Sequence, residues 1–135
     1  MTPSAPATVH LTVRIDRSAD EVYAYASDPS HLPAWASGLA GSIEKSGGQW
    51  VADSPMGRVR IAFAPRNDFG VLDHDVTLPS GETVHNPVRV IADTDGCDVV
   101  FTLRRRPEMS DDEFRRDAGT VAADLEALKR IIERS

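Results

Sequence analysis

The chain has 135 residues, a net charge of −6 and a single cysteine, Cys97. This length fits one domain with one hydrophobic core, and 41% apolar and 27% charged residues are typical of a globular protein. The acidic balance disfavours nucleic acid and anionic membranes, which attract clustered Lys and Arg. No run approaches the roughly 18 apolar residues of a membrane span, so we expect no membrane insertion. One cysteine cannot form an intrachain disulfide, which suits a cytoplasmic protein.

The first seven residues are expected to differ from the rest. Residues 1–7 lack the basic start and the apolar stretch of a signal peptide, and we predict that they form a short disordered lead. Residues 8–135 are predicted to fold as a single domain.

This domain is predicted to begin with a strand and two short helices. Apolar and polar residues alternate over 9–15, which is the period of a half-buried strand. Ser18 and Glu21 form a capping box that starts one helix. Asp28, followed by proline, starts a second helix that ends near Trp35.

The middle of the chain predicts a meander of strands separated by turns. Turn sequences rich in Gly, Pro, Ser and Asp interrupt short alternating segments between residues 39 and 104. Strands are expected near 40–45, 49–53, 59–63, 71–78, 84–91 and 99–103. Together with the first strand they make seven.

Residues 110–134 predict a long amphipathic helix. Ser110 and Glu113 form a second capping box. Apolar residues then recur along one stripe, at Phe114, Ala118, Val121, Leu125, Leu128 and Ile132. A helix this long spans a whole domain, and only the meander is broad enough to receive it. We therefore predict an α+β fold in which a seven-stranded curved antiparallel sheet wraps around the C-terminal helix.

This order of elements resembles the START-like (SRPBCC, helix-grip) superfamily, and within it the bacterial polyketide cyclase/dehydrase-like and lipid-transport-like proteins. The resemblance spans residues 8–133 and implies a ligand-binding domain, with a cavity between sheet and last helix for an apolar molecule. It implies no shared catalytic motif. The segments that carry it are Ser18-Ala19-Asp20-Glu21-Val22-Tyr23, Asp28-Pro29 with Trp35, Gly47-Gly48-Gln49-Trp50, Gly57-Arg58-Val59-Arg60-Ile61, Phe69-Gly70-Val71-Leu72-Asp73-His74-Asp75-Val76 and Val99-Val100-Phe101-Thr102-Leu103.

Strand parity places His74 and Asn86 on the apolar face of the sheet. If residues 80–82 form a three-residue hairpin loop, His74 lies opposite Val88 and Val76 lies opposite Asn86. The same face then carries Leu72, Val84 and Val90. His74 is either a core histidine bonded to a neighbour, or a ligand partner and general acid/base. Asn86 either stabilises a bulge or orients a ligand carbonyl.

Alternate turns of a meander lie at the same end, which predicts a rim near the start of the last helix. Met56, Arg105 and Met109 are expected there, with Arg105 able to meet a carboxylate or phenolate. Alternatively, residues 104–106 are a solvated strand end. Trp35 is either cavity wall or plain core.

The residues predicted to bind ligand are thus His74, Asn86, Leu72, Val76, Val88, Phe101, Trp35, Met56, Arg105, Met109, Phe114, Val121 and Leu125. His74 is the one candidate for a catalytic role. The four histidines are scattered along the chain and no Gly-rich phosphate loop is present, so we expect no metal and no cofactor.

Three functions remain open at this stage. The first is the binding of a small hydrophobic or aromatic ligand, such as a polyketide, lipid or quinone, by a monomer or homodimer. The second is a polyketide cyclase or dehydratase, in which His74 shuttles a proton and Asn86 or Arg105 polarises a carbonyl. The third is a protein-interaction module with a vestigial pocket. The scarcity of buried polar groups favours the first over the second.

Overall fold

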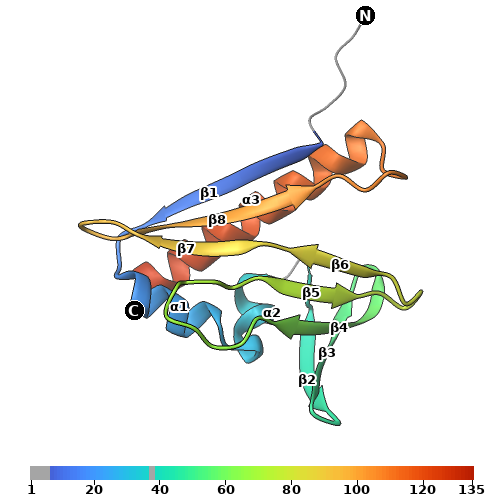
Figure 1. Cartoon of the computed structure of the whole chain (residues 1–135), viewed down its shortest axis with the longest axis horizontal. Helices are drawn as coiled ribbons and strands as arrows, with labels where there is room; N and C mark the ends of the chain where they lie inside the picture. The colour runs from blue at the N-terminus through green and yellow to red at the C-terminus, as the bar shows by residue number, and fades with distance from the viewer. Residues whose placement is uncertain (1–6, 37–38) are drawn as a thin grey trace, which may run out of the picture.

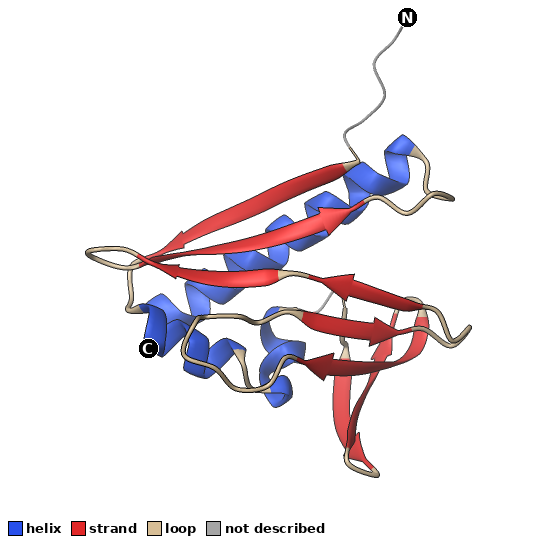
Figure 2. Cartoon of the chain, in the orientation of Figure 1, coloured by secondary structure: helices blue, strands red, loops and turns tan. Residues whose placement is uncertain are grey.

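The computed structural model describes residues 7–36 and 39–135, and it confirms an α+β fold with a long C-terminal helix (Figures 1 and 2). The first strand is followed by the two predicted short helices, and a 3₁₀ turn lies between them. In chain order the elements are β1 (Thr8–Ile15), α1 (Ala19–Ala26), η1 (Pro29–His31), α2 (Leu32–Trp35), β2 (Ser42–Ser46), β3 (Gln49–Ser54), β4 (Gly57–Phe63), β5 (His74–Thr77), β6 (Thr83–Asn86), β7 (Val88–Ala92), β8 (Cys97–Arg104) and α3 (Asp111–Glu133).

The strands form two antiparallel sheets, and the chain bends where it passes from one sheet to the other. One sheet has the order β1-β8-β7 and the other the order β2-β3-β4-β5-β6. Across the junction, Leu72 N donates to Val88 O and Val90 N donates to Gly70 O, both at 2.8 Å. Residues just before β5 therefore continue the pairing onto β7. The result is one open, strongly turned meander, in which β2 and β3 run across the direction of β7 (Figure 1).

The prediction of one strand over 84–91, and so of seven strands, is wrong in this detail. Pro87 separates β6 from β7, which gives eight strands in the described part of the chain. Proline has no backbone N–H and so cannot donate to a ladder. Its carbonyl still accepts from Thr102 N at 2.9 Å, which keeps the break close to β8.

Asp73 supplies hydrogen bonds at this break. Its Oδ1 accepts from Val88 N and from Arg89 Nε, both at 2.9 Å, and its Oδ2 accepts from Arg89 Nη2 at 2.8 Å. The hydrogen bond from Arg89, more than any other contact, holds the pKa of the Asp73 carboxyl below its usual value. This carboxylate joins the start of β5 to β7.

The β5–β6 hairpin keeps the predicted faces but shifts the predicted register by two residues. His74 lies opposite Asn86 instead of Val88, and Val76 lies opposite Val84 instead of Asn86. Because a shift of two preserves parity, the predicted apolar face is retained.

The cause is the position of the hairpin loop. Leu78 N donates to Glu82 O at 2.8 Å, so the three loop residues are 79–81 and not 80–82. Gly81 adopts a φ of 91° in this loop, a conformation that glycine accepts without a steric cost.

Helix α3 lies against β1 and α2, and it passes behind β8 in the view of Figure 1. Its predicted capping box is present: Ser110 Oγ accepts from Glu113 N at 3.1 Å, and Glu113 Oε1 accepts from Ser110 N at 3.0 Å. Its buried side chains are Phe114, Leu125, Leu128 and Ile132. Full burial of each contributes about 1.5–3 kcal/mol.

The predicted disordered lead falls almost wholly on residues 1–6, which lie outside the described residues. Ala7, the last residue of that predicted lead, is described. Its carbonyl accepts from Arg105 N at 2.8 Å.

Candidate functional site

His74 is the one buried polar or charged residue in the described part of the chain, at 4% exposure. It begins β5 and points to the apolar face because of the alternation that places Val76 there. Its Nδ1 lies 3.1 Å from the carbonyl oxygen of Leu72. Burial lowers the pKa of the ring below its usual value, so at neutral pH the imidazole is uncharged.

Asn86 is the second polar group of this face, and it reaches His74 directly. Its Nδ2 lies 3.4 Å from Nε2 of His74, as their opposed positions in the hairpin require. The structure thus brings together the two polar residues that parity had placed on one face.

Two phenylalanine rings flank the imidazole. The ring centroid of Phe63, at the end of β4, is 5.1 Å from that of His74, and the planes are tilted by 43°. Phe101, from β8, presents its ring at 6.2 Å in an edge arrangement. Aromatic pairs at such distances contribute about 0.5–1.5 kcal/mol beyond the area that they bury.

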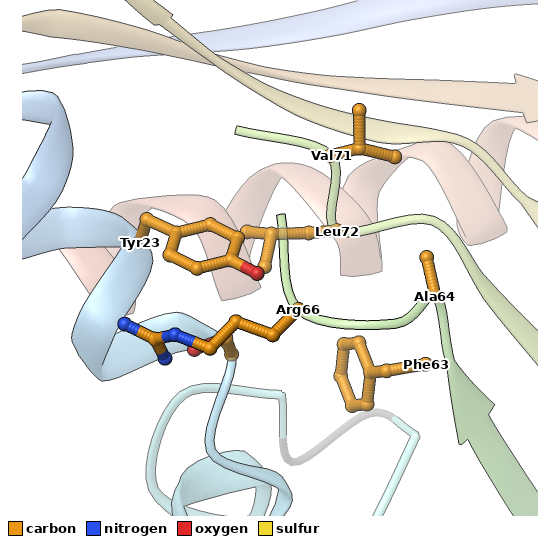
Figure 3. A pocket seen from close by; sticks show the side chains of 7 residues that line it. Tyr23, Phe63, Ala64, Arg66, Val71 and Leu72 are labelled. Carbon is orange, nitrogen blue, oxygen red and sulfur yellow. The ribbon is translucent and has the colours of Figure 1, made fainter. Parts of the chain in front are cut away.

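A small pocket opens beside this cluster, between α1, the end of β4 and the loop that follows (Figure 3). Its volume is about 100 Å³. The lining residues are Tyr23, Ser27, Phe63, Ala64, Arg66, Val71 and Leu72.

The pocket and the histidine cluster share two residues. Phe63 lines the pocket and contacts the His74 ring, and Leu72 lines the pocket while its carbonyl bonds Nδ1. His74 does not line the pocket but is in contact with these two lining residues. We treat the pocket and the His74 cluster as one candidate site.

The loop that forms the mouth of the pocket is held by Asn67. The Asn67 Oδ1 accepts from Phe69 N and Val71 N, both at 3.0 Å, and Nδ2 donates to Pro65 O and Val71 O, both at 2.9 Å. The Asn67 N–H donates to the Tyr23 hydroxyl at 3.1 Å. These bonds fix the loop against α1, so the mouth is pre-formed.

Arg66 covers one side of the mouth. Its guanidinium lies 5.5 Å from the centre of the Tyr23 ring, and the two side chains run alongside each other in Figure 3. Such a cation–π contact at an exposed site contributes about 0.5–1 kcal/mol. It also places a positive charge at the entrance.

The side chains on the apolar face of the sheet differ in how far they are buried. Leu72 and Val88 are fully buried, whereas Phe63, Phe101 and Asn86 remain half-buried although they point inward. Val121 of α3 and Leu78 likewise pack on the core while staying partly exposed.

Two of the turns expected at the rim lie at the same end of the sheet, and Arg105, expected there as a ligand contact, has partners within the protein. A Cβ on Gly57 would lie 3.1 Å from Pro79 Cγ, so the two turns do share an end. Arg105 donates to Met109 O through Nε at 3.1 Å and Nη2 at 2.8 Å, and it pairs with Asp111. Its guanidinium therefore holds the segment that leads into α3.

The remaining predicted site residues divide by burial. Val76, Trp35, Phe114 and Leu125 are buried, Met109 is half-buried, and Met56 is 49% exposed in the β3–β4 turn. The indole Nε1 of Trp35 is buried with no hydrogen-bond partner among the described residues. Of the predicted set, Leu72 lines the pocket itself.

Several lining residues were missed by sequence reasoning. Phe63 shares the inner face of β4 with Val59 and Ile61, so strand parity could have found it. Tyr23 and Arg66 come together only because of the path of the loop after β4, and no local sequence pattern predicts that they line a pocket.

Within residues 7–36 and 39–135, no group of three or more His, Cys, Asp or Glu side chains is arranged to hold a metal ion. Over the same ranges no helix combines the length and apolarity needed to cross a membrane.

Solved structures of similar fold include three from different organisms. The Aha1 dimer from Colwellia psychrerythraea has a TM-score of 0.73 and 13% identity, covering 95% of this chain and 97% of that one. Truncated norcoclaurine synthase from Thalictrum flavum gives 0.65 and 16%, covering 98% and 97%. The protein XoxI from Bacillus cereus gives 0.69 and 17%, covering 94% and 96%. At these identities the likeness shows the fold alone.

Among curated proteins, none matches the chain. A family profile does, over residues 6–134: the family is described as polyketide cyclase / dehydrase and lipid transport. This span includes every element from β1 to α3, and so both the pocket and His74. The chain therefore belongs to the polyketide cyclase / dehydrase and lipid transport family.

Proposed function

We propose that this protein binds a small, uncharged aromatic or apolar molecule in the pocket beside His74, without covalent chemistry. The observation that carries the proposal is the shared wall: Phe63 and Leu72 line a pre-formed pocket and also contact the buried imidazole. Ligand sites are typically apolar, with a few placed polar groups. His74 and Asn86 are such groups here.

The lack of buried charged groups in the protein interior favours an uncharged ligand. His74 is neutral, and it is the one buried polar or charged side chain that the described residues contain. The one charged residue that lines the pocket is Arg66, at its exposed mouth, so a carboxylate or ammonium buried next to His74 would have no counter-ion, and burying an unpaired charge is costly. An uncharged ligand is therefore favoured.

The size of the pocket favours a single ring at its mouth. A volume of about 100 Å³ is smaller than the roughly 150 Å³ of an enclosed cavity that binds benzene, and well below the roughly 300–1,000 Å³ of sites for larger ligands. A polyketide, lipid or quinone would need a wider pocket. One-ring compounds are thus the appropriate first probes.

Acid/base catalysis is the second candidate, and the state of His74 favours one version of it. An imidazole whose pKa is lowered by burial is unprotonated at neutral pH, so it serves as a general base and not as a general acid. The family description names cyclases and dehydrases, and the structural neighbour from Thalictrum is a synthase. Turnover that is lost in His74→Ala while ligand affinity is retained would favour this candidate.

Binding is tested by filling the pocket. Ala64 lines it, and Ala62 is exposed nearby on β4, so Ala64→Phe and Ala62→Phe add the same ring inside and outside the site. Toluene titrated into ¹⁵N-labelled protein should shift amide resonances of the pocket. We expect at least a tenfold loss of affinity in Ala64→Phe and none in Ala62→Phe. Equal affinities for all three proteins would contradict the proposal.

The natural ligand is to be sought in protein purified from its own host. Native mass spectrometry detects a co-purifying molecule as a mass increment that is lost on denaturation. Light scattering on the same sample distinguishes a monomer from a homodimer, the state of the Colwellia neighbour. We expect the protein to act in the cytoplasm, where its single, buried Cys97 stays reduced.

A further inference from the structure

The wall of the pocket is fixed on the side of the sheet. Leu72 is 3% exposed, and its N–H pairs with β7. The backbone of Val71 is held by Asn67, whose Oδ1 accepts from Val71 N and whose Nδ2 donates to Val71 O. The side chain of Ala64 has no rotamers, and its N–H donates to Asp73 O at 2.8 Å. Widening the pocket on this side would therefore break hydrogen bonds that shape the backbone.

Two further lining residues leave little room for movement. The Phe63 ring cannot move inward without displacing the buried His74 ring, because their centroids are 5.1 Å apart. Ser27 caps the end of α1, where its N–H donates to Tyr23 O at 2.9 Å, and its side chain is small. Of the residues that line the pocket, Tyr23 and Arg66 remain. A wider pocket must open on their side.

The Tyr23 side chain is held across the pocket by its tip. It projects from α1 towards the loop, and its hydroxyl accepts from Asn67 N at 3.1 Å (Figure 3). Its ring meets the guanidinium of the exposed Arg66 at 5.5 Å. In the described part of the chain, no other hydrogen bond or ion pair joins α1 to residues 64–71. Breaking one hydrogen bond and one cation–π contact thus releases the ring, which turns about two side-chain torsions.

We propose that the Tyr23 side chain gates the pocket: it turns aside, together with Arg66, when a guest enters or leaves. This inference rests on the proposed function and concerns how that site is entered. The bond from Asn67 N to the hydroxyl holds the closed position in the free and in the bound protein alike. Its loss therefore raises the open fraction of both states, and entry and exit become faster together. A hydroxyl that only stabilised the bound guest would affect the exit rate alone.

Tyr23→Phe tests the gate, because it keeps the ring beside Arg66 and removes the hydroxyl. Line shapes in a ¹⁵N titration with toluene give Kd and koff, and from these kon. A neutral hydrogen bond shifts an equilibrium about two- to tenfold, so we expect kon and koff each to rise by about that factor. Kd should change by less than either rate. Tyr25→Phe is the matched control: it removes the same atom from the same helix, where the Tyr25 ring stacks on His31. It should leave both rates unchanged.

An increase of koff with an unchanged kon would overturn the inference, because the hydroxyl would then act on the bound guest and not on its passage. Unchanged rates in Tyr23→Phe would overturn it too. Both results leave the proposed function intact. Failure of the unmodified protein to bind toluene would overturn the proposed function.

Relaxation dispersion on the ligand-free, unmodified protein tests the gate independently of any ligand. We expect exchange at the Tyr23 ring and at the Asn67 amide with one common rate, and none at the Val71 and Leu72 amides. Exchange at Val71 and Leu72 would mean that the backbone moves instead, and it would overturn the inference. A Tyr23 ring without exchange would overturn it as well.

Discussion

Removal of the Asp73 carboxylate should weaken the junction between the two sheets and destabilise the fold. In Asp73→Ala the Val88 N–H loses its 2.9 Å acceptor, which costs about 1–3 kcal/mol for a buried donor. The bidentate pair with Arg89 is also lost. Because Arg89 is 51% exposed, that pair contributes at most about 1 kcal/mol. The expected decrease in the free energy of unfolding is therefore about 1–4 kcal/mol.

Urea unfolding followed by tryptophan fluorescence measures this decrease. The matched control is Asp75→Ala, which removes an exposed partner of His85 two residues along the same strand. It should cost less than about 1 kcal/mol. Equal losses in the two variants, or a loss below about 0.5 kcal/mol in Asp73→Ala, would refute this account of the junction.

The same carboxylate gives the effect a defined pH dependence. Its pKa in the folded protein lies below the unfolded value, so its stabilisation is fully present above about pH 4. It is lost as the pH falls through the folded value. The stability difference between the unmodified protein and Asp73→Asn should accordingly be constant near neutrality and shrink in acid. A difference that grows in acid would contradict the assignment.

Three other substitutions test the packing around the site. Gly70→Ala should destabilise the fold by more than about 1 kcal/mol, because Gly70 has a φ of 71° and an added Cβ would overlap the Val90 carbonyl; thermal unfolding measures this. Leu125→Ala should lower the free energy of unfolding by about 2–5 kcal/mol in urea, because its side chain is fully buried against the sheet. Phe69→Ser should change the same quantity by no more than about 0.5 kcal/mol, because Phe69 is 83% exposed; a larger loss would mean that it packs on the core.

Much of the fold follows from local patterns. The capping box at Ser110 and the apolar stripe of α3 predict that helix nearly to the residue. The break at Pro87 was missed because apolar residues alternate on both sides of it, so the pattern reads as one strand. The absence of a proline N–H, and not a change in hydrophobicity, ends the ladder there.

The candidate site is only partly predictable, because parity gives faces and not distances. Parity placed His74 and Asn86 on one face although the register was wrong by two residues. Strand parity could not show that the Arg105 guanidinium donates to Met109 O and pairs with Asp111. Those contacts depend on the path of the segment before α3. Free and engaged arginines look the same in a sequence.

The interruption at Pro87 also divides the apolar face between two sheets. Ladder bonds on either side of it belong to separate sheets, and the link between β5 and β7 consists of the Asp73 side chain and a few backbone bonds from residues 70–72. The two sheets are thus joined next to the buried His74, by side-chain and backbone hydrogen bonds that belong to the ladder of neither sheet.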